Sequence, residues 1–379
     1  DMRDTSQLER TKLFHLLKAA WPLPVDEFFP LAYPFSPTDH VFTDARVVVR
    51  EDEPSSIIAF TLDSQNYREQ LANSRQSRSD APLTELRHAD ASHYLYEFDT
   101  ETIKLWCKIF FAEQFDALRH MCGCAEQFVQ SLSRCFKWDS RGGKSGSAFL
   151  KTRDDRFVVK QLSRTELDGF SKFAPQYFTY LAECQSALRP TALTKIFGYF
   201  RIGFKNTHTG RSFKMDFMVM ENLLYGRSVD RIFDLKGSTR HRFVQESGQP
   251  HEVLQDENLM QRAQSSPLLV REHSKRILRT ALHNDSLFLT EMNVMDYSLI
   301  MALDTSRNKM VIGIIDYLRT YTWDKRVESF VKETAILGGG GKGEPTIITP
   351  RQYRMRFLTF LDRNILMTPD PWIQSGWVQ

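Results

Sequence analysis

The sequence has 379 residues, of which 41% are hydrophobic and 26% charged, and this composition excludes a mostly disordered chain or a disulfide-stapled mini-protein. The formal net charge is only +3, from 50 basic and 47 acidic residues, so any attraction to nucleic acid or anionic lipid must come from local clusters. Five cysteines, an odd number without the paired spacing of a structural zinc site, are interpreted as reduced thiols.

The first third of the chain predicts an irregular segment followed by regular elements. From about residue 30 to 90 the hydrophobic periodicity mostly lapses, which indicates a linker or peripheral segment. Within it, an acidic start and Pro54 ahead of apolar residues predict one helix over about 54–72, docked on the main body. Further on, the pattern predicts a strand over 94–98, a dense apolar run over 103–111 and a helix over 112–132.

The remainder predicts a sheet carrying helices, and no internal repeat is found. The predicted strands cover 147–151, 157–162, 195–204, 215–221, 297–303 and 310–315. The predicted helices cover 165–188, 268–289 and 350–366. The polar connector 152–156 has the length of a hairpin turn and joins the first two of these strands.

No apolar run approaches the ~18 residues needed to cross a bilayer, and the first residues lack a signal peptide, so we expect a soluble cytosolic protein. Ordinary thiols are then favoured over a redox role for Cys122 and Cys124. Because the chain opens on Asp1 rather than Met, we expect it to be cut from a longer protein.

A glycine-rich loop precedes the predicted hairpin at 141–147. Glycines let backbone N–H groups approach phosphate oxygens closely, although a tight turn without a ligand would use the same residues. The loop is not a P-loop, because Trp138 stands where its first glycine is required. The later run from Gly338 to Lys342 fails likewise, since Ile336 takes that place.

Lys160 lies on the apolar strand after this loop, where an unpaired ammonium would be costly. Glycine loop, hairpin and strand lysine follow one another as they do where kinases hold ATP phosphates. A surface lysine is the alternative. Glu166, at the start of the next predicted helix, is the candidate ion-pair partner of Lys160.

Two further places carry candidate chemistry. Asp316 ends an apolar strand, where a carboxylate suits a hard cation such as Mg²⁺, although a helix cap or turn would use the same residue. The stretch from Asp234 to Arg242 concentrates cations beside Gly237, which suits phosphate binding or is merely a solvated basic turn. The chain lacks the His-Arg-Asp, Asp-Phe-Gly and Ala-Pro-Glu signatures, which disfavours an ordinary protein kinase.

Three motifs in this order resemble the phosphatidylinositol phosphate kinase family: 234–239 (DLKGST), 295–299 (MDYSL) and 314–316 (IID). The sequence is most similar to the PIKfyve-type phosphatidylinositol 3-phosphate 5-kinases, over about residues 89–372. That similarity rests on the segments 141–146, 173–178, 322–325 and 336–339, and 49–56 looks like the segment preceding that kinase domain. The resemblance implies a two-lobed α+β fold, with antiparallel sheets and packed helices.

The resemblance also implies roles at matching positions. Asp296 corresponds to the catalytic aspartate that acts on the attacking hydroxyl, Asp316 is both catalytic and the Mg²⁺ ligand, and Lys236 neutralises phosphate charge during transfer. The implied ATP-binding residues are Gly143, Lys144, Ser145, Gly146, Ser147, Lys160, Glu221, Asn222 and Leu223. The implied substrate-binding residues are Arg242, Lys325, Arg326, Lys332 and Lys342.

Residues 319–350 resemble the specificity loop of the family, which meets the lipid headgroup, and their basic side chains would face an anionic membrane unless the loop is merely solvated. They lack the two adjacent lysines of the phosphatidylinositol 4-phosphate 5-kinases. The resemblance therefore implies phosphorylation of phosphatidylinositol 3-phosphate at the 5-position, with phosphatidylinositol as a possible second substrate and ATP and Mg²⁺ as cofactors.

Three alternatives stay open at this stage. They are a kinase of another phosphatidylinositol phosphate, such as an activity like that of the 4-phosphate 5-kinases, a non-catalytic membrane scaffold, and a protein kinase side activity. The expected partners are a phosphoinositide membrane, other domains of a longer chain and scaffold or regulatory proteins, without nucleic acid. The expected location is the cytosolic surface of endosomal, vacuolar or lysosomal membranes.

We expect three parts along the chain. These are a partly linker-like N-terminal segment with a docked helix (1–88), a first kinase lobe carrying the glycine-rich loop (89–225), and a second lobe with the catalytic motifs and specificity loop (226–379).

Overall fold

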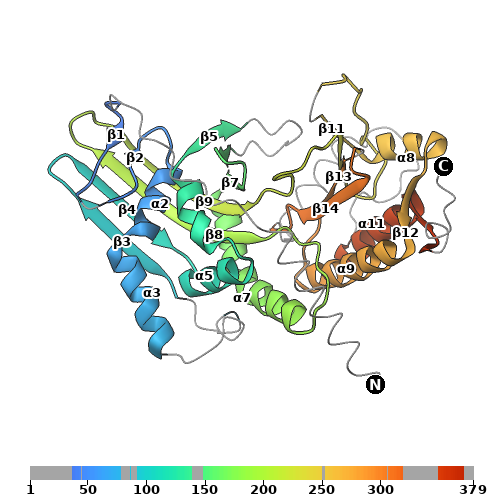
Figure 1. Cartoon of the computed structure of the whole chain (residues 1–379), viewed down its shortest axis with the longest axis horizontal. Helices are drawn as coiled ribbons and strands as arrows, with labels where there is room; N and C mark the ends of the chain where they lie inside the picture. Colours follow the sequence, from blue (N-terminus) through green and yellow to red (C-terminus); the bar gives the residue numbers. More distant parts are fainter. Residues whose placement is uncertain are drawn as a thin grey trace, which may run out of the picture.

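The computed structural model shows two halves side by side, each built around a β-sheet with packed helices (Figure 1). The structure describes residues 36–43, 45–77, 86, 92–138, 148–249, 252–304, 306–318 and 349–370. Within these residues, no helix is both long and apolar enough to cross a membrane. The predicted glycine-rich loop and most of the predicted specificity loop lie outside the described residues.

The first half contains a seven-stranded antiparallel sheet in the order β3-β4-β8-β9-β7-β6-β5. Its strands are β3 (Tyr94–Asp99), β4 (Ile103–Ile109), β5 (Cys135–Trp138), β6 (Phe149–Thr152), β7 (Phe157–Gln161), β8 (Ile196–Asn206) and β9 (Ser212–Glu221). The predicted strands of this half are confirmed. The apolar run at 103–111 forms β4, and β5 was not predicted. The predicted hairpin joins β6 to β7, and β7 lies between β6 and β9.

Five helices pack with this sheet in the described part of the chain: α2 (Ser55–Asp63), α3 (Gln65–Ser77), α5 (Ala112–Met121), α6 (Ala125–Leu132) and α7 (Arg164–Ser186). The prediction of one helix over 54–72 is wrong in one respect. Ser64 adopts an extended backbone and separates α2 from α3. The helix predicted over 112–132 is similarly divided, because the chain turns at Gly123 with a φ of +69°. The docking of the first of these helices is confirmed, since every residue of α2 is buried.

The segment before α2 contains the short strands β1 (Asp39–His40) and β2 (Val49–Arg50), which pair antiparallel. Just after them, the buried carboxylate of Glu53 ties this segment to the sheet. It lies 3.1 Å from Arg134 and 3.2 Å from Arg153, and it accepts the N–H of Cys135 at the start of β5. The described part of the segment predicted to be peripheral is therefore packed onto the first half.

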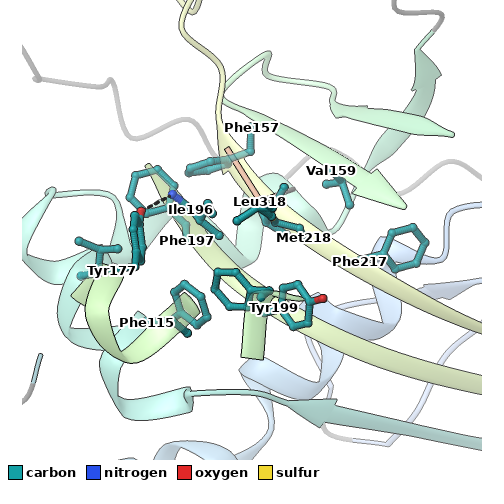
Figure 2. Close-up of a cluster of buried hydrophobic side chains, with 14 of the residues drawn as sticks. Phe115, Phe157, Val159, Tyr177, Ile196, Phe197, Tyr199, Phe217, Met218 and Leu318 are labelled. Carbon is teal, nitrogen blue, oxygen red and sulfur yellow. Dashed lines mark hydrogen bonds between the residues drawn. The ribbon is translucent and has the colours of Figure 1, made fainter. Parts of the chain in front are cut away.

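Stacked aromatic rings fill the core between the sheet and the helices (Figure 2). The ring of Phe170 on α7 lies 4.5 Å from that of Tyr199 on β8 and 6.0 Å from that of Phe115 on α5. The hydroxyl of Tyr177 accepts the backbone N–H of Ile196, shown as a dashed line in Figure 2. Because each buried aromatic ring removes a large apolar area from water, this core fixes α7 and β8 relative to each other.

The second half contains a four-stranded sheet in the order β11-β10-β13-β14. Its strands are β10 (Arg231–Leu235), β11 (Val253–Leu254), β13 (Ser298–Asp304) and β14 (Lys309–Ile315), and its helices are α8 (Asp256–Ser265), α9 (Glu272–Glu291) and α11 (Pro350–Asn364). The predicted strands near 297–303 and 310–315 are confirmed as the antiparallel pair β13 and β14.

One prediction for this half is wrong at its boundary. The helix predicted over 268–289 begins only at Glu272, because Leu268–Arg271 forms β12 instead. This strand pairs in parallel with β15 (Ile365–Thr368), which follows the final predicted helix directly. A short apolar run does not distinguish a strand from a helical turn, so only the pairing partner 97 residues away decides its structure.

Candidate active site

Lys160 occupies a buried position on the interior strand β7, and only 5% of the residue is exposed. Its Nζ lies 3.0 Å from Oε1 of Glu166 and 3.5 Å from Oδ1 of Asp316. The predicted ion pair with Glu166 is confirmed, and the alternative of a solvated surface lysine is excluded. An ammonium buried to this degree needs anionic partners, and here they come from both halves of the molecule.

Glu166 is positioned by the start of α7. Ser163 caps this helix, and the two residues form a capping box in which the Glu166 carboxylate accepts the N–H of Ser163 at 2.9 Å. Burial alone would raise the pKa of Glu166, but the Ser163 hydrogen bond and the Lys160 charge outweigh it and hold the pKa below 4.5. The carboxylate is thus a fixed anion that orients Lys160.

Asp316 follows β14 directly and points back toward Lys160. Its backbone has a φ of +58°, in the left-handed region that residues other than glycine rarely adopt. Asp296, two residues before β13, has a φ of +64°. Strained conformations of this kind persist only where the surroundings hold them, and they cluster at functional sites. Both predicted catalytic aspartates therefore stand at unusual backbone positions.

The register of the second sheet brings three predicted residues to one edge. Ser298 pairs with Ile315, so Asp296 and Asp316 emerge at the same end of the β13–β14 ladder. Leu235 pairs with Leu299, which places Lys236 at this end too. Nζ of Lys236 donates to the backbone carbonyl of Asp296 at 2.7 Å. The tertiary fold thus gathers motifs that lie 60 and 80 residues apart in the sequence.

A cleft between the halves is lined by both Asp316 and Lys160. Its polar lining is Lys160, Glu166, Asp316 and Thr194, and its apolar lining includes Ile196, Met218, Met220 and Ile315. An apolar wall that ends in a buried cation and a carboxylate suits a flat aromatic ring linked to an anionic group. The lining therefore has the chemistry expected beside nucleotide phosphates, and ATP binding at Lys160 stays a prediction.

Comparison with known proteins identifies the group to which the chain belongs. The family model described as phosphatidylinositol-4-phosphate 5-kinase matches residues 131–310 and 303–364. The chain belongs to this family, the phosphatidylinositol phosphate kinases. The predicted family resemblance and the predicted mixed α and β fold with antiparallel sheets are confirmed.

Several curated relatives are similar over most of the chain. It is 39% identical over 99% of its length to the 1-phosphatidylinositol 3-phosphate 5-kinase FAB1 of Saccharomyces cerevisiae. It is 40% identical over 87% of its length to 1-phosphatidylinositol-3-phosphate 5-kinase FAB1B of Arabidopsis thaliana, and 44% identical over 79% to the 1-phosphatidylinositol 3-phosphate 5-kinase of Homo sapiens. The alignments span only 20%, 21% and 14% of these three proteins, respectively, so the chain corresponds to a small part of each.

One side chain that supports the predicted site was missed from the sequence. Asp256, at the start of α8, is fully buried, and its Oδ1 accepts the N–H of Lys236 at 3.0 Å and of Gly237 at 2.7 Å. Gly237 has a φ of +73°, and a Cβ there would lie 2.6 Å from the backbone of Phe357. Asp256 therefore holds the backbone that carries Lys236. Its place among the acidic residues that begin a helix was the only sequence signal.

The same carboxylate engages Arg242, which was predicted to bind substrate. Nε of Arg242 lies 2.8 Å from Asp256, and Nη2 lies 2.9 Å from Asp234. Burial would lower the pKa of Arg242, but the charges of these two aspartates raise it overall. The guanidinium therefore braces the 234–242 turn, and a direct bond to substrate stays a prediction.

Of the other residues predicted to bind ATP, only Glu221, Asn222 and Leu223 are among the described residues. Glu221 follows the cleft residue Met220, but its carboxylate accepts the N–H of Lys195 at 2.6 Å. Asn222 donates to the carbonyl of Asp155 at 2.7 Å, and Leu223 packs against Gly313. These side chains border the cleft without lining it. The remaining predicted residues lie outside the described residues, namely Gly143, Lys144, Ser145, Gly146, Ser147, Lys325, Arg326, Lys332 and Lys342.

The residues present are compatible with Mg²⁺. No group of three or more His, Cys, Asp or Glu side chains that could hold a metal occurs in the part of the chain that the structure describes. Mg²⁺ usually keeps several waters and binds one or two carboxylates together with substrate phosphates, so a dedicated cluster is not required. Asp316 offers the right kind of ligand, because its carboxylate is 49% exposed and faces the cleft.

Proposed function

We propose that this chain is the catalytic domain of a lipid kinase that transfers the γ-phosphoryl group of ATP to the 5-hydroxyl of phosphatidylinositol 3-phosphate. The observation that carries the proposal is Lys160, a buried strand lysine bridging Glu166 and Asp316 across the two halves. The names of the yeast, plant and human relatives support this substrate and regiochemistry.

In the proposed mechanism, the residues of this chain position the reactants and neutralise charge. The inositol 5-oxygen forms a bond to the γ-phosphorus while the bond from this phosphorus to the β,γ-bridging oxygen breaks, and ADP leaves. The proton of the attacking hydroxyl passes to the carboxylate of Asp296. Lys160 holds the ATP phosphates, and Lys236, anchored on the carbonyl of Asp296, faces the charge that develops during transfer.

Asp316 is the proposed Mg²⁺ ligand. The ion, when bound through Asp316 and the nucleotide, would neutralise phosphate charge and orient the terminal phosphate. Asp316→Asn should therefore abolish phosphoryl transfer while leaving the fold intact, since the half-exposed carboxylate loses charge but keeps its shape. A purified variant with wild-type turnover would reject this assignment.

The proposed site of action is the cytosolic surface of endosomal, vacuolar or lysosomal membranes, with further domains and regulatory proteins in a longer molecule. Basic residues of the segment 319–350, including Lys325 and Arg326, would attract anionic lipid. Neutralising both should weaken sedimentation with anionic vesicles in a salt-dependent manner. Neutralising Arg276 and Arg279, whose side chains on α9 are 76% and 72% exposed, is the matched control. Equal effects of the two pairs would contradict the proposed membrane face.

The decisive experiment is transfer from radiolabelled ATP to vesicles containing phosphatidylinositol or one of its 3-, 4- or 5-phosphates, with the product regiochemistry determined. Label in phosphatidylinositol 3,5-bisphosphate supports the proposal. Preferential use of the 4-phosphate would favour the second candidate, to which the description of the matching family model points. Absence of transfer to every lipid would favour the non-catalytic scaffold. Exchanging the segment 319–350 with that of a relative of known preference tests whether it selects the headgroup.

A further inference from the structure

A short segment outside the predicted motifs connects the two sheets beside the cleft. Residues 192–194, here called the strap, precede β8 of the first half and pair with β14 of the second. The N–H of Ile314 donates to the carbonyl of Ala192 at 2.6 Å, and the N–H of Thr194 donates to the carbonyl of Ile314 at 3.0 Å. The strap is thus an additional strand-like partner at the edge of the second sheet.

The strap holds the backbone on both sides of Asp316. Ile314, two residues before it, makes the paired bonds just described, and the hydroxyl of Tyr317, directly after it, donates to the carbonyl of Thr194. Asp316 itself keeps the strained positive φ. Because such a backbone persists only when neighbouring contacts determine it, the strap is positioned to impose this conformation.

Asp285 on α9 anchors the other side of the strap. The residue is fully buried, and its Oδ2 accepts the N–H of Ala192 at 2.6 Å. Its Oδ1 accepts the hydroxyls of Tyr180 on α7 at 2.6 Å and of Thr191 at 2.8 Å. One buried carboxylate therefore ties α9, α7 and the strap together, and every one of these bonds requires it to act as an acceptor.

We propose that Asp285 is a positioning residue that acts through the strap to hold Asp316 in its metal-binding conformation. A continuous series of hydrogen bonds runs from Asp285 to Ala192, across to Ile314, and back from Tyr317 to Thr194. The hydrogen bonds of Asp285 go to Tyr180, Thr191 and Ala192, none of which lines the cleft, so its effect on Asp316 passes through the strap. The inference rests on the proposed function, because it assigns Mg²⁺ binding to Asp316.

Asp285→Asn tests this inference with a one-atom change. An amide can still accept two hydroxyls through its oxygen, but its NH₂ group would then face the N–H of Ala192, donor against donor. Partners outside the immediate shell of a metal site typically change metal affinity 10- to 100-fold when mutated. The readout is the dissociation constant of a fluorescent ATP analogue, measured with Mg²⁺ and with a chelator, at a temperature where the variant is folded.

We expect Asp285→Asn to lower the gain in nucleotide affinity conferred by Mg²⁺ by about tenfold, while the affinity in chelator stays unchanged because Lys160 is untouched. Asp304→Asn is the matched control. Asp304 is a buried carboxylate like Asp285, but it lies on β13, at the end of the β13–β14 pair opposite to Asp316. A wild-type gain in Asp285→Asn, or an equal loss in Asp304→Asn, overturns the inference.

Tyr317→Phe serves as a second variant should Asp285→Asn fold poorly. It removes only the hydroxyl that bonds to Thr194 and keeps the buried ring. The same selective loss of the Mg²⁺-dependent gain is expected, and an unchanged gain counts against the strap. If the wild-type protein itself gains no affinity from Mg²⁺, the proposed function fails and the inference fails with it. If Mg²⁺ raises the nucleotide affinity of the wild-type protein and raises that of the variants equally, the proposed function stands and only the inference fails.

Discussion

Replacing Lys160 by methionine separates the catalytic role of this residue from its structural role. Methionine replaces the apolar stem of the side chain but lacks the ammonium that pairs with Glu166 and Asp316. Glu166 keeps its bonds to the N–H and hydroxyl of Ser163, and Asp316 is half-exposed, so neither carboxylate is left buried and unsatisfied. We therefore expect a folding cost of about 1–3 kcal/mol, below the 3–5 kcal/mol typical of an orphaned buried ion.

The expected catalytic cost of this substitution is larger. Removing one group that stabilises developing charge typically lowers kcat about 10²- to 10³-fold, or roughly 3–4 kcal/mol. A domain with a stability of about 5–15 kcal/mol stays almost entirely folded at 25 °C after a loss of 1–3 kcal/mol, so unfolding does not explain the lost turnover. Two measurements are needed: the midpoint of thermal unfolding, and radiolabel transfer to phosphatidylinositol 3-phosphate vesicles.

Lys151→Met is the matched control for Lys160→Met. Lys151 lies on the neighbouring strand β6, pairs with Asp155 at 2.8 Å and does not line the cleft. We expect wild-type turnover from this variant. Turnover of Lys160→Met within about tenfold of wild type, or an equal loss in Lys151→Met, would refute the role assigned to Lys160.

Three further predictions concern stability and reactivity. Glu53→Gln should lower the free energy of unfolding by about 2–4 kcal/mol in urea titrations, because the buried carboxylate holds Arg134 and Arg153; an unchanged midpoint would speak against this cluster. Glu166 has a folded pKa below its ordinary value of 4.5, so its ionised form stabilises the folded state. This contribution to the free energy of unfolding should be complete above pH 4.5 and should disappear as the pH falls through the folded pKa. The stability difference between wild type and Glu166→Gln should therefore shrink in acid, and a pH-independent difference would contradict the depressed pKa. Burial raises the pKa of Cys107 to about 12, and this residue is fully buried, so the folded protein should resist alkylation of its thiol at pH 8; rapid labelling detected by mass spectrometry would be inconsistent with that burial.

Local patterns predicted most of the elements and singled out the charged cleft residues Lys160, Glu166 and Asp316. The alternation of Tyr94 and Tyr96 and the apolar strand carrying Lys160 predicted β3 and β7, because side-chain periodicity reports directly which face is buried. The requirement of a buried ammonium for an anion likewise predicted the partner Glu166, six residues away. Motif resemblance pointed to Asp296 and Asp316 before either could be placed in space.

Other features depend on contacts between distant segments. Leu268–Arg271 is a strand only because β15 pairs with it, and local propensity carries no information about that partner. Asp256 and Asp285 look like ordinary helix residues in the sequence. Their importance arises because packing buries each carboxylate against backbone N–H groups of another segment.

The sequence by itself thus determined the family, the main strands and helices, and which charged residues require a partner. The tertiary structure alone decided that Asp316 joins Glu166 as a partner of Lys160, that Asp256 supports Lys236, and that a strap brackets Asp316. The physical reason is that burial and hydrogen bonding depend on distances in space. Residues up to 156 positions apart acquire those distances only when the two sheets pack together.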